Sequence, residues 1–374
     1  MTVAQDNKSQ WLSIEQKYLP VHFQLAQLLD LVMSADIPQH KILRGTGLFY
    51  EDLVRSDALI CPKQMAVLVA NTQQYLSHQE VSFRWGASLW PGYAGVFSQS
   101  LGASESLLAA LETLKLFRHW LSPVVVPDIH ITDTLCLVYW KNTYGVDEKV
   151  RRFFVETYMS ALVSLTIEHS VDGQSHWRCG VQHLDANGPH RVYLGEHVSC
   201  LNMDVMVIER REAEIEWRKG SMHLRELATQ QALTAYRHVD AETFPEAVQV
   251  YLSSRLSEAT SVAVAAEAFS MSCATLKRRL SAYGTHFQAL LDEVRMQHSL
   301  YLIHVLGWSN ERIADYLNVG DSANFRRAFK RWTGLSPSAS RDKYASFIPR
   351  QIKSNQSSHT NSELPPSGLP EYAL

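Results

Sequence analysis

Four cationic side chains lie close together near the C-terminal end of the chain: Arg326, Arg327, Lys330 and Arg331. An arginine guanidinium can donate two parallel hydrogen bonds to O6 and N7 of a guanine, whereas a lysine ammonium binds phosphate as a compact point charge. These residue types therefore favour contact with a nucleic acid. A solvated basic helix in an ordinary domain would have the same composition, so the surrounding elements must decide between the two interpretations.

Residues 309–337 predict a helix, a tight turn and a second helix. In the second helix, apolar residues recur at i, i+3, i+4 and i+7, the period of a helix that buries one stripe. These residues are Phe325, Ala328, Phe329 and Trp332. Ser309 or Asn310 can cap the first helix, Asn318 can adopt the left-handed turn conformation, and Gly334 can end the second helix. The cationic side chains then fall on the outer side.

A second copy of this pattern lies upstream, at residues 261–284. Matching positions are 48 or 49 residues apart: Ala266 and Ala314, Leu276 and Phe325, Arg278 and Arg327, and Leu280 and Phe329. In a helix-turn-helix the alanine lets the two helices approach closely, and the apolar pair fixes their crossing angle. Residues 285–305 predict one helix of about 30 Å, close to the roughly 34 Å of one DNA turn. The repeat favours two DNA-reading units joined by a rigid helix.

Residues 245–345 resemble the twin helix-turn-helix domain of the AraC/XylS family of transcription regulators. The resemblance rests on the motif AFKRWTGLSP, on Arg295 with its surrounding apolar residues, and on the two alanine-containing turns. Residues 35–230 more weakly resemble the arabinose-binding-type effector domain of one branch of that family. The chain departs from the family pattern at Ser270 and Asn318, where glycine is usual, and in SPSASR at the last helix.

The resemblance implies, by position, which residues meet DNA. These are Ala274, Thr275, Lys277 and Arg278 on the first recognition helix, and Ala323, Asn324, Arg326, Arg327, Lys330 and Arg331 on the second. Arg278 and Arg327 suit guanine, and Asn324 suits adenine. The lysines and Arg331 suit phosphates. The implied protein is a sequence-specific regulator that binds double-stranded DNA, acts as a homodimer and is not an enzyme.

The rest of the chain predicts an α+β fold, in which a mixed α/β effector domain at 1–236 precedes the all-α twin helix-turn-helix domain at 245–345. The first 75 residues read as a helical cap. Helices are predicted at 16–35, 104–121 and 147–167, and a further helix from Pro62. Strands are predicted at 135–140, 177–184 and 205–209. The aromatic stretch 83–95 is predicted to form strands or loops. The tail 351–374, rich in Ser, Asn and Pro, is predicted to be disordered.

Aromatic residues in the N-terminal half could line an apolar pocket for a small-molecule effector. The candidates are Trp85, Trp90, Tyr93, Phe97 and Tyr139, although any one of them could equally be a core residue. The resemblance implies a transcriptional activator, with RNA polymerase as a further partner. The effector would shift the population of arrangements in which the two units are presented to DNA.

A metal- or redox-sensing protein is the alternative function. Histidines recur every seven residues from His169 to His197, and five cysteines are scattered along the chain. Glycines and Pro189 between the histidines exclude a single helix with a histidine stripe, and no HExxH or CxxC pair is present. No GxSxG is present either, so no catalytic residue, metal site or cofactor is predicted.

The charge distribution is compatible with a DNA partner. The whole chain has a formal net charge of −3, but residues 241–350 contain 13 Lys and Arg against 10 Asp and Glu. No apolar run approaches the length of a membrane span, and the polar N-terminus lacks the pattern of a signal peptide. These features predict a cytoplasmic protein with no membrane partner.

Overall fold

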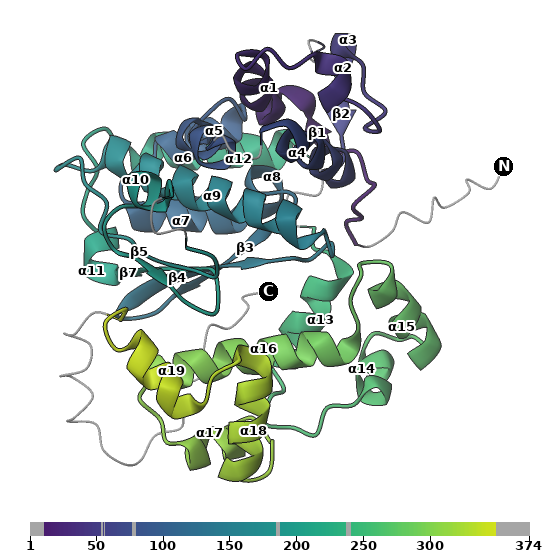
Figure 1. Ribbon diagram of the computed structural model, residues 1–374, viewed down its shortest axis with the longest axis vertical. Helices are drawn as coiled ribbons and strands as arrows, with labels where there is room; N and C mark the ends of the chain where they lie inside the picture. The colour runs from purple at the N-terminus through teal and green to yellow at the C-terminus, as the bar shows by residue number, and fades with distance from the viewer. Residues whose placement is uncertain are drawn as a thin grey trace.

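The computed structural model describes residues 11–53, 55, 57–76, 80–184, 188–236 and 241–348. Figure 1 shows a small helical group from the N-terminal residues, a sheet covered by helices, and a helical C-terminal region on the other side of that sheet. The tail predicted to be disordered, and residues 237–240 between the two predicted domains, lie outside the described residues.

A five-stranded sheet with the order β3-β4-β7-β5-β6 forms the centre of the fold. The strands are β3 (Val126–Ile131), β4 (Leu135–Lys141), β5 (Arg178–Val181), β6 (Val198–Cys200) and β7 (Val205–Glu209). Neighbouring strands are antiparallel except β5 and β6, which are parallel. The strands predicted at 135–140 and 205–209 are confirmed, and the one predicted at 177–184 is shorter.

Helices cover one face of this sheet (Figure 1). They are α5 (Val81–Leu89), α6 (Val96–Gly102), α7 (Leu107–Leu116), α8 (Arg118–Leu121), α9 (Glu148–His169), α10 (His190–Leu194), α11 (Arg210–Ala213) and α12 (Met222–Ala235). The predicted helix at 147–167 is confirmed as α9, which Asp147 caps. Among the described residues, no helix is both long and apolar enough to cross a membrane.

The N-terminal residues form short elements on top of these helices. They are β1 (Leu19–Pro20), the 3-10 helix η1 (Val21–Phe23), α1 (Leu25–Met33), α2 (Gln39–Ile42), α3 (Tyr50–Leu53), β2 (Leu59–Ile60) and α4 (Pro62–Leu76). The helix predicted from Pro62 is confirmed. The helix predicted at 16–35 was too long, because a strand and a 3-10 turn precede α1.

Two further predictions for this half were wrong in part. Residues 83–89 of the aromatic stretch predicted as strands or loops belong to α5, whose buried residues include Val81, Trp85 and Leu89 at a spacing of four, and residues 90–95 form a loop. Tertiary packing overrides local propensity here. Gly86 lets α5 pack so closely on α9 that a Cβ at this position would overlap the carbonyl oxygen of Thr157. The single helix predicted at 104–121 is two helices, α7 and α8, separated by Phe117.

The C-terminal region contains the two predicted helix-turn-helix units. Its helices are α13 (Phe244–Ser253), α14 (Val262–Ala268), α15 (Cys273–Ser281), α16 (Phe287–His304), α17 (Asn310–Tyr316), α18 (Ser322–Thr333) and α19 (Pro337–Tyr344). We call α14 with α15 the first unit and α17 with α18 the second unit. The turns have φ of +52° at Ser270 and +50° at Asn318, so both residues adopt the left-handed conformation for which glycine is usual.

The second face of the sheet packs against this C-terminal region. Alternate residues of β4 divide between two apolar cores, because successive side chains of a strand point to opposite faces. Cys136, Val138 and Trp140 belong to the core under the covering helices. Leu135, Leu137 and Tyr139 belong to a second core that contains the apolar residues of α16. The fold is α+β, as predicted, and its two parts share a buried surface.

Candidate nucleic-acid interface

The recognition helices α15 and α18 bury one face and expose the other. Their inner apolar residues, Leu276, Leu280, Phe325 and Phe329, have no exposed surface. The predicted DNA-facing residues lie on the other side. Ala274, Lys277, Arg278, Asn324, Arg326, Arg327, Lys330 and Arg331 are exposed, and Thr275 and Ala323 are partly exposed. The structure therefore leaves the predicted reading faces accessible beside the effector domain.

Contacts within the second unit orient some of these side chains. Asp321 caps α18 by accepting from the Asn324 backbone N–H at 2.7 Å. Arg327 donates to Oδ1 of Asn324, which holds the guanidinium and the amide side by side on the exposed face. Arg331 contacts a residue outside the second unit, because its Nη2 lies 3.2 Å from Oδ1 of Asp292, in the first half of α16. Sequence spacing did not reveal this last pair, because it joins two helices.

A buried joint connects the first helix of the C-terminal region to α8. The Glu246 carboxylate accepts from the backbone N–H and hydroxyl of Thr243 at 2.9 and 2.8 Å, which completes a capping box on α13. Arg118 Nε lies 3.4 Å from Oε1 of Glu246, and His119 Nε2 lies 3.0 Å from Oε2. The Glu246 side chain is 7% exposed, so water screens these charges little.

The same joint is attached to the core of the effector domain. The hydroxyl of Tyr18 donates to the carbonyl oxygen of His119 at 3.0 Å. The Gln24 amide donates to the carbonyl oxygens of Trp120 and Leu121 at 3.2 and 2.8 Å. Because α8 is only four residues long, these bonds fix the whole helix. A displacement in the core around α8 would therefore reach α13.

A second polar layer lies where the sheet meets α16. Lys141 Nζ lies 2.7 Å from Asp128 on the sheet side, and the Gln249 amide donates to Glu293 of α16 at 2.9 Å. Burial raises the pKa of Glu293, an effect that the nearby Lys141 partly offsets. Burial also lowers the pKa of His298 to about 3, so this imidazole is neutral at ordinary pH.

Two family models match this chain. One, described as a helix-turn-helix domain, matches residues 265–343. The other, described as the arabinose-binding domain of AraC transcription regulator, N-terminal, matches residues 37–175. The matched segments contain the two units and most of the effector domain whose geometry is given above. The chain belongs to the AraC type of transcription regulators.

Known relatives of this AraC-type regulator match only short parts of it. It is 43% identical over 68 residues to the ornithine utilization regulator of Pseudomonas aeruginosa. The matched segment covers 18% of this chain and 20% of that protein. It is 26% identical over 114 residues to the HTH-type transcriptional regulator VqsM of Pseudomonas aeruginosa. The matched segment covers 30% of this chain and 35% of that protein. The chain thus spans about a fifth and a third of these two relatives.

One solved structure matches over most of the length. It is the crystal structure of the transcriptional regulator CdpR from Pseudomonas aeruginosa, at 17% identity and a TM-score of 0.36, covering 86% of this chain and 98% of that one.

The structure separates the five effector-pocket candidates of this AraC-type regulator. Trp85, Trp90 and Phe97 are buried in the core under the covering helices. Tyr93 is 74% exposed on the surface, and Tyr139 lies on the second sheet face, against the C-terminal region. Alternation along β4 explains the position of Tyr139, because it is an odd-numbered residue beside Val138 and Trp140. The candidates therefore do not form a single pocket.

The predicted histidines and cysteines are also dispersed. Cys61, Cys136 and Cys179 are buried, whereas Cys200 and Cys273 are exposed. His176 lies 3.1 Å from Asp172 on the surface, and His190 is buried in α10. In the part of the chain that the structure describes, no three His, Cys, Asp or Glu residues come together as a metal site.

The Glu246 joint gives a test of how firmly the two parts of the AraC-type regulator are connected. Burial by itself raises the pKa of Glu246. The opposing effects of His119, Arg118 and the backbone N–H of Thr243 are together larger, so the pKa lies well below its ordinary value of 4.5. A glutamine can still complete the capping box but loses the charge. We expect Glu246→Gln to lower the free energy of unfolding by about 2–4 kcal/mol in urea titrations near pH 7.

The sign of the pH dependence follows from the lowered pKa. The carboxylate of Glu246 stabilises the folded protein fully above pH 4.5, and this contribution is lost as the pH falls below that value. The difference between the original protein and Glu246→Gln should therefore shrink in acid. Glu258→Gln is the matched control, because Glu258 pairs with Arg255 at 2.8 Å on the surface and should change the stability by less than about 0.5 kcal/mol. Equal effects of the two substitutions would contradict this account.

Proposed function

We propose that this AraC-type regulator binds specific sequences of double-stranded DNA through both helix-turn-helix units. The observation that carries the proposal is the pair of recognition helices, each with a buried apolar stripe and an exposed polar and cationic face. The helix between the units, α16, has 18 residues, or about 27 Å at 1.5 Å per residue. That length suits two units in successive major grooves, which are roughly 34 Å apart.

The exposed residues divide into two roles. Arg278 and Arg327 occupy matching positions in the two recognition helices and would each donate to O6 and N7 of a guanine. Asn324, bonded to Arg327, would read an adjacent adenine. Lys277, Lys330 and Arg331 would bind phosphates, and Ala274, Thr275, Ala323 and Arg326 would contact the groove between them.

Binding assays can test these roles. Genomic fragments that the protein retains at physiological salt provide the operator. Arg327→Ala should weaken operator binding by about 1–3 kcal/mol and relax the preference at one base pair. Lys330→Ala should weaken binding to operator and random DNA alike and reduce the salt slope by about one.

Arg191→Ala is the control for this pair of variants, because Arg191 is 56% exposed on α10 of the effector domain. It should leave operator binding unchanged. An original protein that binds random DNA as tightly as every retained fragment would falsify the proposal of specific reading.

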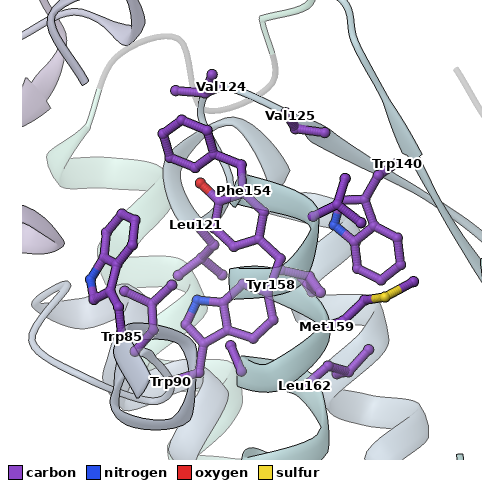
Figure 2. Close-up of a cluster of buried hydrophobic side chains, with 14 of the residues drawn as sticks. Trp85, Trp90, Leu121, Val124, Val125, Trp140, Phe154, Tyr158, Met159 and Leu162 are labelled. Carbon is purple, nitrogen blue, oxygen red and sulfur yellow. The ribbon is translucent and has the colours of Figure 1, made fainter. Parts of the chain in front are cut away.

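We propose that the effector domain binds a small, mainly apolar molecule near Trp90 and Tyr158. The two rings stack with centroids 5.9 Å apart and planes at 7° (Figure 2). Both residues are buried, and neither Nε1 of Trp90 nor the Tyr158 hydroxyl has a hydrogen-bond partner among the described residues. The same holds for Nε1 of Trp140, in the same cluster. Buried polar groups are usually hydrogen-bonded, and a ligand with acceptor atoms would supply the partners.

The substitution Tyr158→Phe tests this effector site. Removing a buried hydroxyl that has no partner in the protein should leave the apo protein as stable or slightly more stable. The variant should then lose most of the thermal shift that an effector gives the original protein in a metabolite screen. A Tyr158→Phe protein that is clearly destabilised without ligand, or that keeps the full shift, would argue against a ligand at this hydroxyl.

We propose that the regulator is a homodimer and that α12 forms its interface. This helix buries Ala228 and Ala232 and exposes large apolar side chains. They are Met222, Leu224, Leu227 and Leu233, with exposed fractions of 56%, 60%, 55% and 41%. Leu224 and Leu227, three residues apart, are neighbours on the helix surface. Neighbouring exposed apolar residues mark an interaction surface, and a second copy would cover the same surface on both chains.

Light scattering on purified protein tests the dimer. Leu227→Glu should convert the dimer to a monomer, because two buried carboxylates would face each other near the symmetry axis. Val192→Glu is the control, since Val192 is 78% exposed on α10 and lies outside α12. A monomeric original protein, or a dimer that survives Leu227→Glu, would exclude α12 as the interface.

We propose activation as the sign of regulation, through contact with RNA polymerase at the promoter, with the protein in the cytoplasm where its DNA lies. A reporter gene behind a retained operator decides the sign: expression that rises with the intact protein and falls with Arg327→Ala supports activation, and the opposite result supports repression.

A further inference from the structure

Two loops of the effector domain contact the C-terminal ends of the two recognition helices, one loop for each helix. We propose that these loops set the angle between the units, so that the state of the effector domain selects the spacing of the DNA half-sites that the protein reads. Gly145 and Asn202 are then positioning residues. The inference rests on the proposed DNA binding and adds how that binding is controlled.

The first contact lies at the end of α15. Gly145 is in the loop between β4 and α9, and a Cβ at this position would lie 2.5 Å from the carbonyl oxygen of Tyr283 and 3.1 Å from the Cα of Gly284. The ring of Tyr144 stacks on that of Tyr283 with centroids 6.2 Å apart. The Tyr283 hydroxyl also donates to the carbonyl oxygen of Leu12 at 2.6 Å. The backbone of this effector-domain loop thus packs directly against the backbone at the end of the first recognition helix.

The second contact lies at the end of α18. Asn202, in the loop between β6 and β7, donates from Nδ2 to the carbonyl oxygen of Thr333 at 2.6 Å. Its Oδ1 accepts from Lys343 of α19 at 2.8 Å. Gly334 ends α18 in the left-handed conformation, with the Asn202 amide 3.6 Å from where its Cβ would be. One asparagine therefore connects the second recognition helix and the last helix to the effector domain.

The two loops are joined to each other within the effector domain. Tyr139 pairs with Val205 in the sheet, so the end of β4 and the start of β7, from which the loops extend, are neighbours. Arg151, near the start of α9, pairs with Asp204 of the second loop at 2.7 Å, and both side chains are 11% exposed. Asp204 also accepts from the Gln182 backbone N–H at 3.0 Å. A movement of α9 would therefore be transmitted to both loops.

The angle between the units would then depend on the effector domain as well as on α16, the helix that joins them. α9 carries Tyr158, whose hydroxyl is the proposed effector contact, and Arg151, which is tied to Asp204. A ligand that displaces α9 would shift the loops that hold Tyr283 and Thr333. Because the DNA-facing residues themselves remain exposed, the effect would be on the relative placement of the two reading faces and not on their access to DNA.

The test uses the full chain and a set of operators whose two half-sites are moved apart or together by one base pair, about a tenth of a helical turn. The readout is the ratio of affinities for the altered and the original spacing, measured by titration. Gly145→Ala inserts a methyl group against Tyr283, and Asn202→Ala removes the bond to Thr333. Each should change that ratio by roughly three- to tenfold, the equivalent of one lost hydrogen bond.

Gly173→Ala is the matched control for Gly145→Ala. Gly173 has φ of +67° and Gly145 +63°, so alanine is strained equally at both, but no atom lies within 4 Å of a Cβ at Gly173. Loss of folded protein lowers the affinity for every DNA equally and leaves the ratio unchanged, so the ratio isolates positioning from stability. Asn202→Ala alters only an exposed side chain and provides an independent variant if Gly145→Ala does not fold.

The outcomes separate this inference from the proposed function. A changed ratio for Gly145→Ala or Asn202→Ala, with no change for Gly173→Ala, supports the two-loop control of spacing. Ratios equal to that of the original protein in both variants overturn it, even while operator binding itself persists. If the original protein shows no preference for any operator, the proposed function has failed instead.

Discussion

The burial of both faces of the central sheet is the constraint on which the rest of the structure depends. β4 is buried at every residue, and its alternate side chains belong to two different cores. An apolar sheet face cannot remain in water without losing the free energy that its burial provides. The helices of the effector domain cover one face and α16 covers the other, so the effector domain and the C-terminal region share the second core.

This shared core explains why the contacts between the two parts are specific. Apolar packing alone fixes orientation poorly, because it is not directional. The carboxylate of Glu246, the amide of Asn202 and the backbone at Gly145 each require particular partners at particular places. A displaced partner would leave the buried carboxylate of Glu246 unpaired, which strongly disfavours other arrangements of the two parts.

The recognition helices take no part in this surface through their outer faces. Each is fixed to its own unit by buried leucine or phenylalanine residues, and its contact with the effector domain described above lies near its C-terminal end. The residues proposed to contact bases and phosphates thus remain exposed, while the helices that carry them are held in place. Such a design suits a protein whose sensing part alters geometry without covering the DNA-binding surface.

The sequence by itself determined the two units, because their signals are local: apolar residues at helical spacing, serine caps before α14 and α17, and turn residues at Ser270 and Asn318. It also determined which side chains of α15 and α18 face outward. Only the tertiary structure decided that residues 81–89 form a helix, and that Tyr93 and Tyr139 lie apart from Trp90. The tertiary structure alone brought Arg118 to Glu246, Gly145 to Tyr283 and Asn202 to Thr333. Contacts between residues more than a hundred positions apart depend on how whole elements pack, and they leave no periodic pattern in the chain.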